Sequence, residues 1–289
     1  MFRALQELID QQTWVDTIGE PLQQFVRSLF TNGGETGKQV KNFLNGTWLG
    51  HPLHPVLTDV PVGAWVSTSV LDTVASLTED ESMERAADIT LSLGLLAAAG
   101  AAVTGFTDWS DTYGQQRKLG LLHGLTMGAA VAAYTSSLLS RLRGSRGTGV
   151  AMANTGLAVL TLGAYLGGDE VYDLGYNVNH TAFQHGPDTF VAVMPEADLR
   201  PDKATKADAK GVPIMLVKQG SQIYALDDTC VHAGCSLSGG QLEGASIVCP
   251  CHGSQYDLRD GSVINGPATM PEPHYEVRVQ NGAIEVRRA

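Results

Sequence analysis

Apolar and polar residues follow two different patterns along this chain of 289 residues, and the change falls near residue 188. Between residues 44 and 175, apolar and small residues form long stretches. Three of these contain no Asp, Glu, Lys or Arg: residues 89–107, 119–140 and 147–168. Each is close to the roughly 20 residues that cross the hydrocarbon core of a bilayer as a helix. A fourth stretch, residues 55–77, is interrupted by Asp59 and Asp72. The pattern therefore predicts four antiparallel transmembrane helices.

A soluble helical bundle with an Ala-rich core is the alternative interpretation of this pattern. The apolar stretches contain many Thr and Ser, and the mean hydropathy of the whole chain is −0.02. The polar last third of the chain lowers that mean. In the membrane interpretation, Asp59 and Asp72 would be costly against lipid, so we expect both to face the interior of the bundle.

Residues 1–43 carry apolar side chains at helical spacing. This predicts amphipathic N-terminal helices that lie on a membrane surface or a partner, or that cover the protein's own core. The segment has neither the basic start nor the apolar stretch of an export signal. The residues that form the pattern are Phe2, Leu5, Leu8, Ile9, Leu22, Phe25, Val26, Leu29 and Phe30.

From residue 188 to the end, the chain changes to short segments rich in β-branched and aromatic residues. They are residues 191–194, 213–218, 222–226, 246–248, 255–258, 275–279 and 283–286. Turn signals such as Asp260-Gly261 and Asn281-Gly282 separate them, which predicts a small antiparallel β-sandwich or barrel. The fold class is therefore α+β multidomain, with domains at residues 1–43, 44–175 and 188–289.

The composition restricts the function. The net charge is −11 and no block of basic residues is present, which argues against nucleic acid as a partner. All four cysteines lie between Cys230 and Cys251. A secreted protein stabilised by disulfides would spread its cysteines along the chain, so these four serve one local site.

That site has the pattern Cys-x-His, sixteen residues, Cys-x-x-His. Its first segment contains Cys230 and His232, and its second contains Cys249 and His252. Two thiolates on one iron and two imidazoles on the other hold a Rieske-type [2Fe–2S] cluster. A structural zinc ion also accepts two Cys and two His. Zinc fingers, however, pair Cys with Cys and His with His, so the mixed segments favour the two-iron cluster.

The C-terminal domain resembles the Rieske proteins of cytochrome bc-type quinol oxidases. The resemblance implies that Cys230 and Cys249 bind one iron and that His232 and His252 bind the other. It also implies a disulfide between Cys235 and Cys251, a pair that Rieske ferredoxins of oxygenases usually lack. Ser254 and Tyr256 match hydroxyl donors that raise the cluster potential in this family. Gly266-Pro267-Ala268 resembles the loop that covers the cluster.

The helical half resembles a family of uncharacterised bacterial four-helix membrane proteins whose first helix is rich in His and Pro. His51-Pro52-Leu53-His54-Pro55 and Pro61-Val62-Gly63 carry the likeness. The resemblance implies topology and no particular chemistry.

Five of the eight histidines are expected at one end of the predicted bundle: His51, His54, His123, His180 and His185. A b-type haem would take His54 and His123 as axial ligands from facing helices. A quinone pocket would use His51, His54, His123 and Asp59 to exchange protons with the ring oxygens. The third interpretation is that His51 and His54, each followed by Pro, hydrogen-bond locally at the start of a helix.

These observations predict an electron-transfer subunit of an oxidoreductase, a multi-pass protein of a bacterial cell membrane, with a cluster domain too firmly joined to act as a mobile shuttle. It would relay single electrons between a partner redox enzyme and a membrane haem or quinone. By analogy, the partner is a membrane-associated dehydrogenase or hydrogenase. The alternatives are a quinol-oxidising subunit of a respiratory complex, a redox sensor module and an oxygenase ferredoxin. Basic residues flank both ends of the predicted bundle, so the positive-inside rule favours neither orientation.

Overall fold

The computed structural model describes residues 12–289, and the apolar positions Phe2, Leu5, Leu8 and Ile9 lie outside that range. The chain forms two compact units. One contains Leu53–Leu174 together with the chain up to Gly37, and the other contains Lys38–Pro52 and Gly175–Ala289. The fold class is α+β, as the sequence predicts, with helices first and antiparallel sheets after them.

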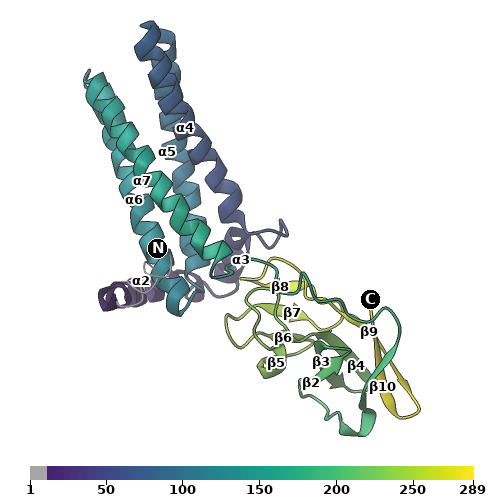
Figure 1. Cartoon of the computed structure of the whole chain (residues 1–289). Coiled ribbons are helices and arrows are strands. Elements are labelled where there is room, and N and C mark those ends of the chain that lie inside the picture. Colours follow the sequence, from purple (N-terminus) through teal and green to yellow (C-terminus); the bar gives the residue numbers. More distant parts are fainter. Residues whose placement is uncertain (1–11) are drawn as a thin grey trace. The chain divides into compact units, whose positions relative to one another are not determined.

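Within the described residues, the α-helices lie between Thr13 and Tyr172 (Figure 1). The first two overlap the predicted N-terminal segment, the second ending at Asn45, and the other four are longer. In chain order they are α2 (Thr13–Thr31), α3 (Gly34–Asn45), α4 (Leu53–Thr78), α5 (Glu81–Trp109), α6 (Gly114–Leu142) and α7 (Arg146–Tyr172). The Asp80 side chain caps α5 by accepting a hydrogen bond from the Ser82 N–H at 2.7 Å.

Within the described residues, three helices are long and apolar enough to cross a membrane: α4, α5 and α7. Helix α6 does not meet this criterion. Arg117 and Lys118 lie near its start and Arg141 near its end, and the stretch between them contains Thr, Ser and His. The sequence predicts four membrane spans, and three helices have the length and composition that a span requires.

The two aspartates of α4 differ in their environment. Asp72 is buried, as expected. The expectation that Asp59 also faces the interior is wrong, because its side chain is exposed. The two residues lie about equally far from the ends of α4, so depth along the helix does not distinguish them. Asp72 is buried because it pairs with Arg141 of α6.

Three contacts between α4 and α6 reveal an internal repeat. His54 lies against His123, with ring centroids 6.4 Å apart. Trp65 stacks on Tyr134 with centroids 4.1 Å apart. Asp72 binds Arg141, and this pair is 69 residues apart in the chain, as are the other two. Corresponding residues thus meet one another along helices that run in the same direction.

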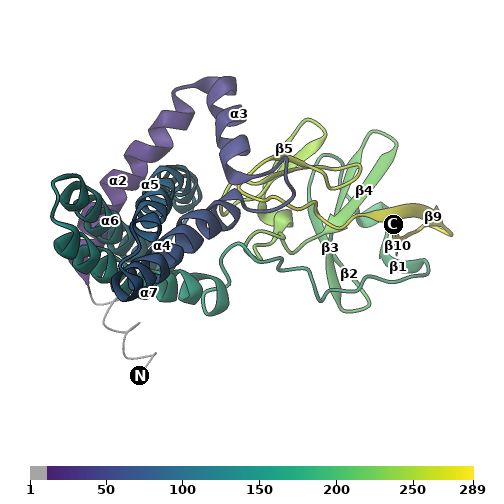
Figure 2. The same cartoon turned by 90° about the horizontal axis from the view of Figure 1, so that it is seen from above.

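The α4–α5 and α6–α7 hairpins are therefore two copies of one unit, related by an approximate two-fold axis along the bundle (Figure 2). Glycines repeat as well. A Cβ at Gly94 would collide with the Trp65 ring, and a Cβ at Gly156 would collide with the Tyr134 ring. Each hairpin thus keeps one glycine where its aromatic residue packs.

An ion-pair cluster joins the four long helices at the end where α4 and α6 finish, with Asp72 and Arg141 buried at its centre and the other members partly exposed. Arg141 Nη1 donates to Asp72 Oδ1 at 2.9 Å and to Asp88 Oδ1 at 2.8 Å. Arg146 Nη2 donates to Asp72 Oδ1 at 2.9 Å, and Arg146 also pairs with Glu84. Charges in such a place require partners of opposite sign, and here each has one.

The β unit contains three antiparallel sheets, in the orders β1-β10-β9, β2-β3-β4 and β5-β6-β7-β8. The strands are β1 (Val191–Pro195), β2 (Thr205–Ala209), β3 (Val212–Gln219), β4 (Gln222–Asp227), β5 (Gln241–Glu243), β6 (Ser246–Val248), β7 (Gln255–Asp257), β8 (Val263–Asn265), β9 (Tyr275–Gln280) and β10 (Ala283–Arg288). Short 3-10 helices lie at Glu196–Asp198 and Leu237–Gly239.

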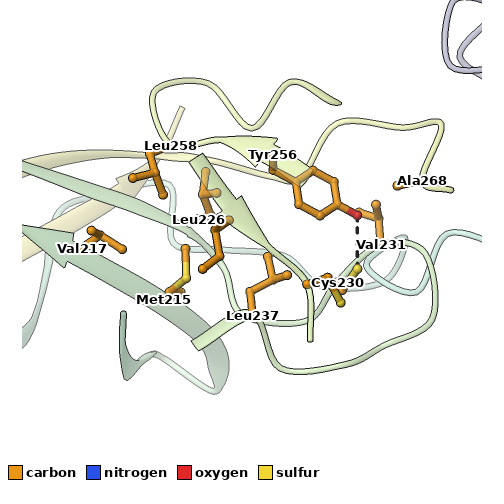
Figure 3. Close-up of a cluster of buried hydrophobic side chains, with 11 residues drawn as sticks. Met215, Val217, Leu226, Cys230, Val231, Leu237, Tyr256, Leu258 and Ala268 are labelled. Carbon is orange, nitrogen blue, oxygen red and sulfur yellow. Dashed lines mark hydrogen bonds between the residues drawn. The ribbon is translucent and has the colours of Figure 1, made fainter. Parts of the chain in front are cut away.

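Two apolar cores stabilise this unit. The first contains Ile214, Leu216, Ile284 and their neighbours. The second contains Met215, Leu226, Leu237 and Tyr256, and it reaches the cysteine-containing loops (Figure 3). Side chains on successive residues of β3 enter different cores, because they alternate between the faces of a strand. The second core thus gives the loops a rigid base.

Candidate metal centre

Two loops of the β unit carry the cysteines and have matching backbone hydrogen bonds. In the first, the Cys230 N–H donates to Cys235 O and the Gly234 N–H donates to Cys230 O, both at 2.8 Å. In the second, the Cys249 N–H donates to Ser254 O at 2.8 Å and the Gly253 N–H donates to Cys249 O at 3.1 Å.

The glycine has positive φ in both loops, +73° for Gly234 and +77° for Gly253, a conformation that other residues rarely adopt. Each tight turn presents one cysteine and one histidine on the same side.

The structure brings the four predicted ligands together in two pairs. Cys230 and Cys249 are 1% and 2% exposed, and their side chains hydrogen-bond each other. This contact lowers the pKa of Cys249 to about 6 and raises the pKa of Cys230. The rings of His232 and His252 lie beside each other, with centroids 4.9 Å apart. The sulfur pair is buried and the imidazole pair lies outside it.

The site fits a two-iron cluster better than a single zinc ion. Within the described residues, no three His, Cys, Asp or Glu side chains converge as they would around one metal ion. Both ring nitrogens of His232 are buried without a hydrogen-bond partner, which is unfavourable unless one of them binds a metal. Burial and the neighbouring His252 lower the pKa of His232 to about 3, so its ring is neutral, the form that binds metals.

Two hydroxyl groups lie at the base of the site. Tyr256 Oη is 3.1 Å from Cys230 Sγ, and Tyr256 has no exposed surface (Figure 3). Burial raises the pKa of Tyr256 well above its usual value, so the hydroxyl keeps its proton. Ser254 is also fully buried, and its Oγ accepts the Ala268 N–H at 3.0 Å. Ala268 belongs to the predicted covering loop, which is therefore joined to the second cysteine loop.

A disulfide between Cys235 and Cys251 links the two loops, with Cα atoms 6.4 Å apart. One cysteine comes from each loop, so the bond fixes their separation on the side of the histidines.

Glu272 also belongs to this site, although no sequence motif predicts it. Its Oε2 accepts the Val231 N–H at 3.0 Å, between Cys230 and His232. The side chain is 1% exposed, and its Oε1 is buried without a hydrogen-bond partner. Burial raises the pKa of Glu272 to about 9, so the group is neutral near pH 7. The only sequence signal is its position between Pro271 and Pro273, which marks a rigid loop.

Two segments that flank the long helices belong to the cluster unit. After α7, the His180 N–H donates to Val231 O at 3.0 Å, and Gln184 Nε2 donates to Thr229 Oγ1 at 3.1 Å. Before α4, Asn42 Nδ2 donates to Ile264 O at 3.2 Å. Asn42 Oδ1 also accepts the Gly266 N–H at 2.9 Å. The cluster unit thus includes hydrogen-bonded segments that precede and follow the long helices.

These segments also cover one of the histidines. The Tyr176 ring lies edge-on to His232, with centroids 6.3 Å apart. Pro52, Asn177 and Val178 line a small hollow over His232 together with the covering loop. As a result His232 is only 6% exposed.

Of the four residues suggested for a haem or quinone site, the structure brings together two. His54 and His123 form the contact described above, in the helical unit. His51 and Asp59 are exposed and do not take part in that pair. His180 lies in the cluster unit against Gly234, and His185 is exposed.

The fold and the paired ligands define the class as a one-electron carrier of the Rieske type. The family described as Rieske [2Fe-2S] domain matches residues 189–282. The chain belongs to this family. A second family, described as predicted membrane protein (DUF2231), matches residues 50–180.

Two curated relatives each match about a third of this chain. Ferredoxin CarAc of Metapseudomonas resinovorans is 34% identical over 98 residues, which are 34% of this chain and 92% of that protein. The 3-phenylpropionate/cinnamic acid dioxygenase ferredoxin subunit of Escherichia coli (strain K12) is 37% identical over 91 residues, 31% of this chain and 85% of that protein. Both relatives are named as ferredoxins, and the second as a subunit of a dioxygenase.

Among solved structures, the ferredoxin of carbazole 1,9a-dioxygenase from Nocardioides aromaticivorans IC177 is 31% identical. The match covers 35% of this chain and 99% of that chain, with a TM-score of 0.34. The two family matches together show a Rieske [2Fe-2S] domain that follows a predicted membrane protein domain.

Proposed function

We propose that this protein is a multi-pass membrane protein that relays single electrons between a partner redox enzyme and an acceptor in its helical unit. In this proposal Cys230 and Cys249 hold one iron of the cluster, and His232 and His252 hold the other. The bound cluster supplies a reversible one-electron centre. The domains are the membrane part at residues 44–175 and the cluster part at residues 188–289.

The chain's own residues prepare this centre. The Tyr256 hydroxyl keeps its proton and donates to the Cys230 sulfur once that sulfur is a thiolate. Such a donor stabilises the added negative charge of the reduced state and raises the potential. Glu272 is neutral near pH 7 and adds no negative charge beside the sulfurs. Both features favour a potential in the upper part of the Rieske range, which extends to about +300 mV.

The observation that carries the proposal is the attachment of the cluster loops to both segments that flank the long helices. The bonds from His180, Gln184 and Asn42 each hold a loop of the cluster unit. A domain that swings between two partners needs a free hinge instead. A fixed relay therefore fits the chain better than a mobile shuttle.

The direction of transfer depends on the partner. A membrane-associated dehydrogenase or hydrogenase would deliver electrons at His252, which is less buried than His232. One relative is the ferredoxin subunit of a dioxygenase, so an oxygenase-type enzyme as electron acceptor is the second candidate. A subunit that oxidises quinol at a cluster histidine is disfavoured by the cover over His232. A redox sensor would need no acceptor at all.

Low-temperature EPR of the full chain in detergent, titrated from oxidised to dithionite-reduced, tests the proposal. We expect a rhombic Rieske signal that titrates with one electron at high potential and is reoxidised by an acceptor in the same protein. Reduction by quinol alone would favour the quinol-oxidising subunit. A cluster that exchanges electrons with no acceptor would refute the relay.

The fixed attachment has its own test. Asn42→Ala removes the bond to Gly266 of the covering loop and the bonds to Ile264 and Asn265 of β8. We therefore expect slower electron transfer out of the cluster in stopped-flow measurements, at an unchanged cluster content. Gln219→Ala is the matched control, since this exposed amide bonds only Gly244 O inside the β unit. Equal rates in the two variants would contradict a fixed relay.

A further inference from the structure

His54 and His123 occupy corresponding positions in the repeated hairpins of the helical unit and meet near their common two-fold axis. Their ring centroids are 6.4 Å apart and their planes are nearly perpendicular, at 86°. Neither ring belongs to the cluster site. Two imidazoles in edge contact between apolar helices indicate a function, because ionisable side chains are rare among membrane-type helices.

Backbone carbonyls fix the protonation of both rings in the same way. His54 Nδ1 is 2.8 Å from Ala101 O on α5, and His123 Nδ1 is 2.8 Å from Gly163 O on α7. A carbonyl can only accept a hydrogen bond, so Nδ1 carries the proton in each ring and Nε2 carries a lone pair. Among the described residues, the hydrogen bonds of these two rings all involve Nδ1. Metal-binding histidines are held in this way by an outer partner.

Two glycines make room for the rings. Gly105 follows Ala101 by one helical turn, and Gly167 follows Gly163 by one turn. A Cβ at Gly105 would lie 2.8 Å from His54 Cε1, and a Cβ at Gly167 would lie 3.1 Å from His123 Cε1. The carbonyl, the glycine and the histidine thus recur as a set in both hairpins. The Nε2 lone pair of each histidine therefore has the same setting within its own hairpin.

The spacing of the rings selects the kind of ligand. A metal–nitrogen bond is about 2.0 Å long, and the centroid of an imidazole lies about 1.2 Å behind its nitrogen, so two axial imidazoles on one metal have centroids roughly 6.3 Å apart. The observed separation matches this value. Two imidazoles that bind opposite oxygens of a quinone would lie a ring width and two hydrogen bonds apart, which is much farther.

The number of ligands selects haem over a bare metal ion. Within the described residues, no third His, Cys, Asp or Glu joins a group that could hold a metal. A bare ion bound by two imidazoles would lack most of its protein ligands. A haem iron already has four nitrogens from the porphyrin and requires only two axial groups.

We propose that His54 and His123 are the axial ligands of a b-type haem that lies across the two-fold axis of the repeated hairpins. The inference rests on the proposed function, because it names the acceptor inside the helical unit. Haem binding itself is measurable whether or not the cluster delivers electrons to it. The two ideas can therefore fail separately.

The test uses the full chain, produced with haem available and purified in detergent. We expect a reduced-minus-oxidised optical spectrum of b type, a pyridine haemochrome assay near one haem per chain, and a low-spin EPR signal of two imidazole ligands. His54→Gln and His123→Gln should each lower the haem content and abolish the low-spin signal of two imidazole ligands, since each removes one axial nitrogen. The Rieske EPR signal should remain in both variants and shows that they fold.

Two further variants separate ligation from packing. His51→Ala removes an exposed histidine close to α4 and should leave the haem content unchanged. His123→Met offers a different axial ligand, so any haem retained should show an altered low-spin EPR signal, which a purely structural histidine would not produce. Wild-type protein with a full cluster and no haem would overturn the inference, as would full haem content in the His54→Gln variant. Haem that is present and never reduced by the cluster would refute the relay and leave the site in place.

Discussion

The hydroxyl of Tyr256 offers the sharpest test of how this chain sets its cluster potential. Tyr256→Phe removes one buried oxygen, 3.1 Å from Cys230 Sγ, and leaves the ring in its core. A hydrogen bond to a charged group contributes about 1.5–3 kcal/mol. Because the thiolate is more negative in the reduced cluster, part of this bond strengthens only on reduction. A difference of about 1 kcal/mol between the two redox states corresponds to roughly 40 mV for one electron.

We therefore expect the midpoint potential of Tyr256→Phe to fall by roughly 40 mV, measured by EPR during a redox titration. Ser254→Ala should lower it in the same direction. Tyr224→Phe is the matched control, since Tyr224 packs partly buried against the same core and should leave the potential unchanged. An unchanged potential in Tyr256→Phe, with an intact cluster signal, would refute the role of this hydroxyl.

Three further changes test other parts of the structure. Glu272→Gln should flatten the pH dependence of stability. The folded pKa of about 9 exceeds the unfolded value of 4.5, so the folded state binds an extra proton between these values and loses about 1.4 kcal/mol per pH unit as the pH rises. The thermal midpoint at about pH 6 and pH 8 measures this. Asp72→Asn should destabilise the helical unit by about 3–5 kcal/mol, because the buried Arg141 loses its buried carboxylate partner and keeps only the more exposed Asp88. Thermal unfolding in detergent measures it. Replacing Cys235 and Cys251 by Ser should remove about 3 kcal/mol, as expected for a separation of 16 residues, and shorten the lifetime of the visible cluster absorbance on heating.

Each change has a control within the chain. Glu243→Gln alters an exposed acid of the β unit and should keep the wild-type pH dependence. Asp59→Asn alters the exposed aspartate of α4 and should leave the thermal midpoint nearly unchanged. For the disulfide, a reductant alone should reproduce the effect of the double Ser variant. If a test variant behaves like its control, or if the reductant has no effect, the physical argument behind that prediction is wrong.

The sequence was informative where the chemistry is local. The cluster motif lies in two short loops, so its spacing alone indicates two pairs of ligands. Seven predicted strand segments coincide with strands, while the sequence pattern does not predict β2, β5 and β8. Strand β2 reads Thr-Lys-Ala-Asp-Ala and has little apolar character, and the other two are three residues long.

Long-range features were harder to predict. The burial of Glu272 depends on how a proline-flanked loop packs against the first cysteine loop, which no local pattern encodes. Asp59 and Asp72 look alike in the sequence, and only the partner Arg141 distinguishes them. The repeat did leave a signal, since His54 and His123 each precede an aromatic residue by eleven positions, Trp65 and Tyr134. A search for self-similarity would have paired the two histidines.

The ion pair between Asp72 and Arg141 also bears on the symmetry of the helical unit. In a symmetric dimer of identical hairpins, a residue on the axis faces its own copy. An aspartate would then meet an aspartate, and an arginine would meet an arginine, each with strong repulsion between buried like charges. Histidine and aromatic residues can face themselves without this penalty, and those positions are still alike in the two halves. Opposite charges at this place require two halves of different sequence, which a single chain carrying both hairpins provides. The two halves of the bundle are therefore not interchangeable, although they share one architecture.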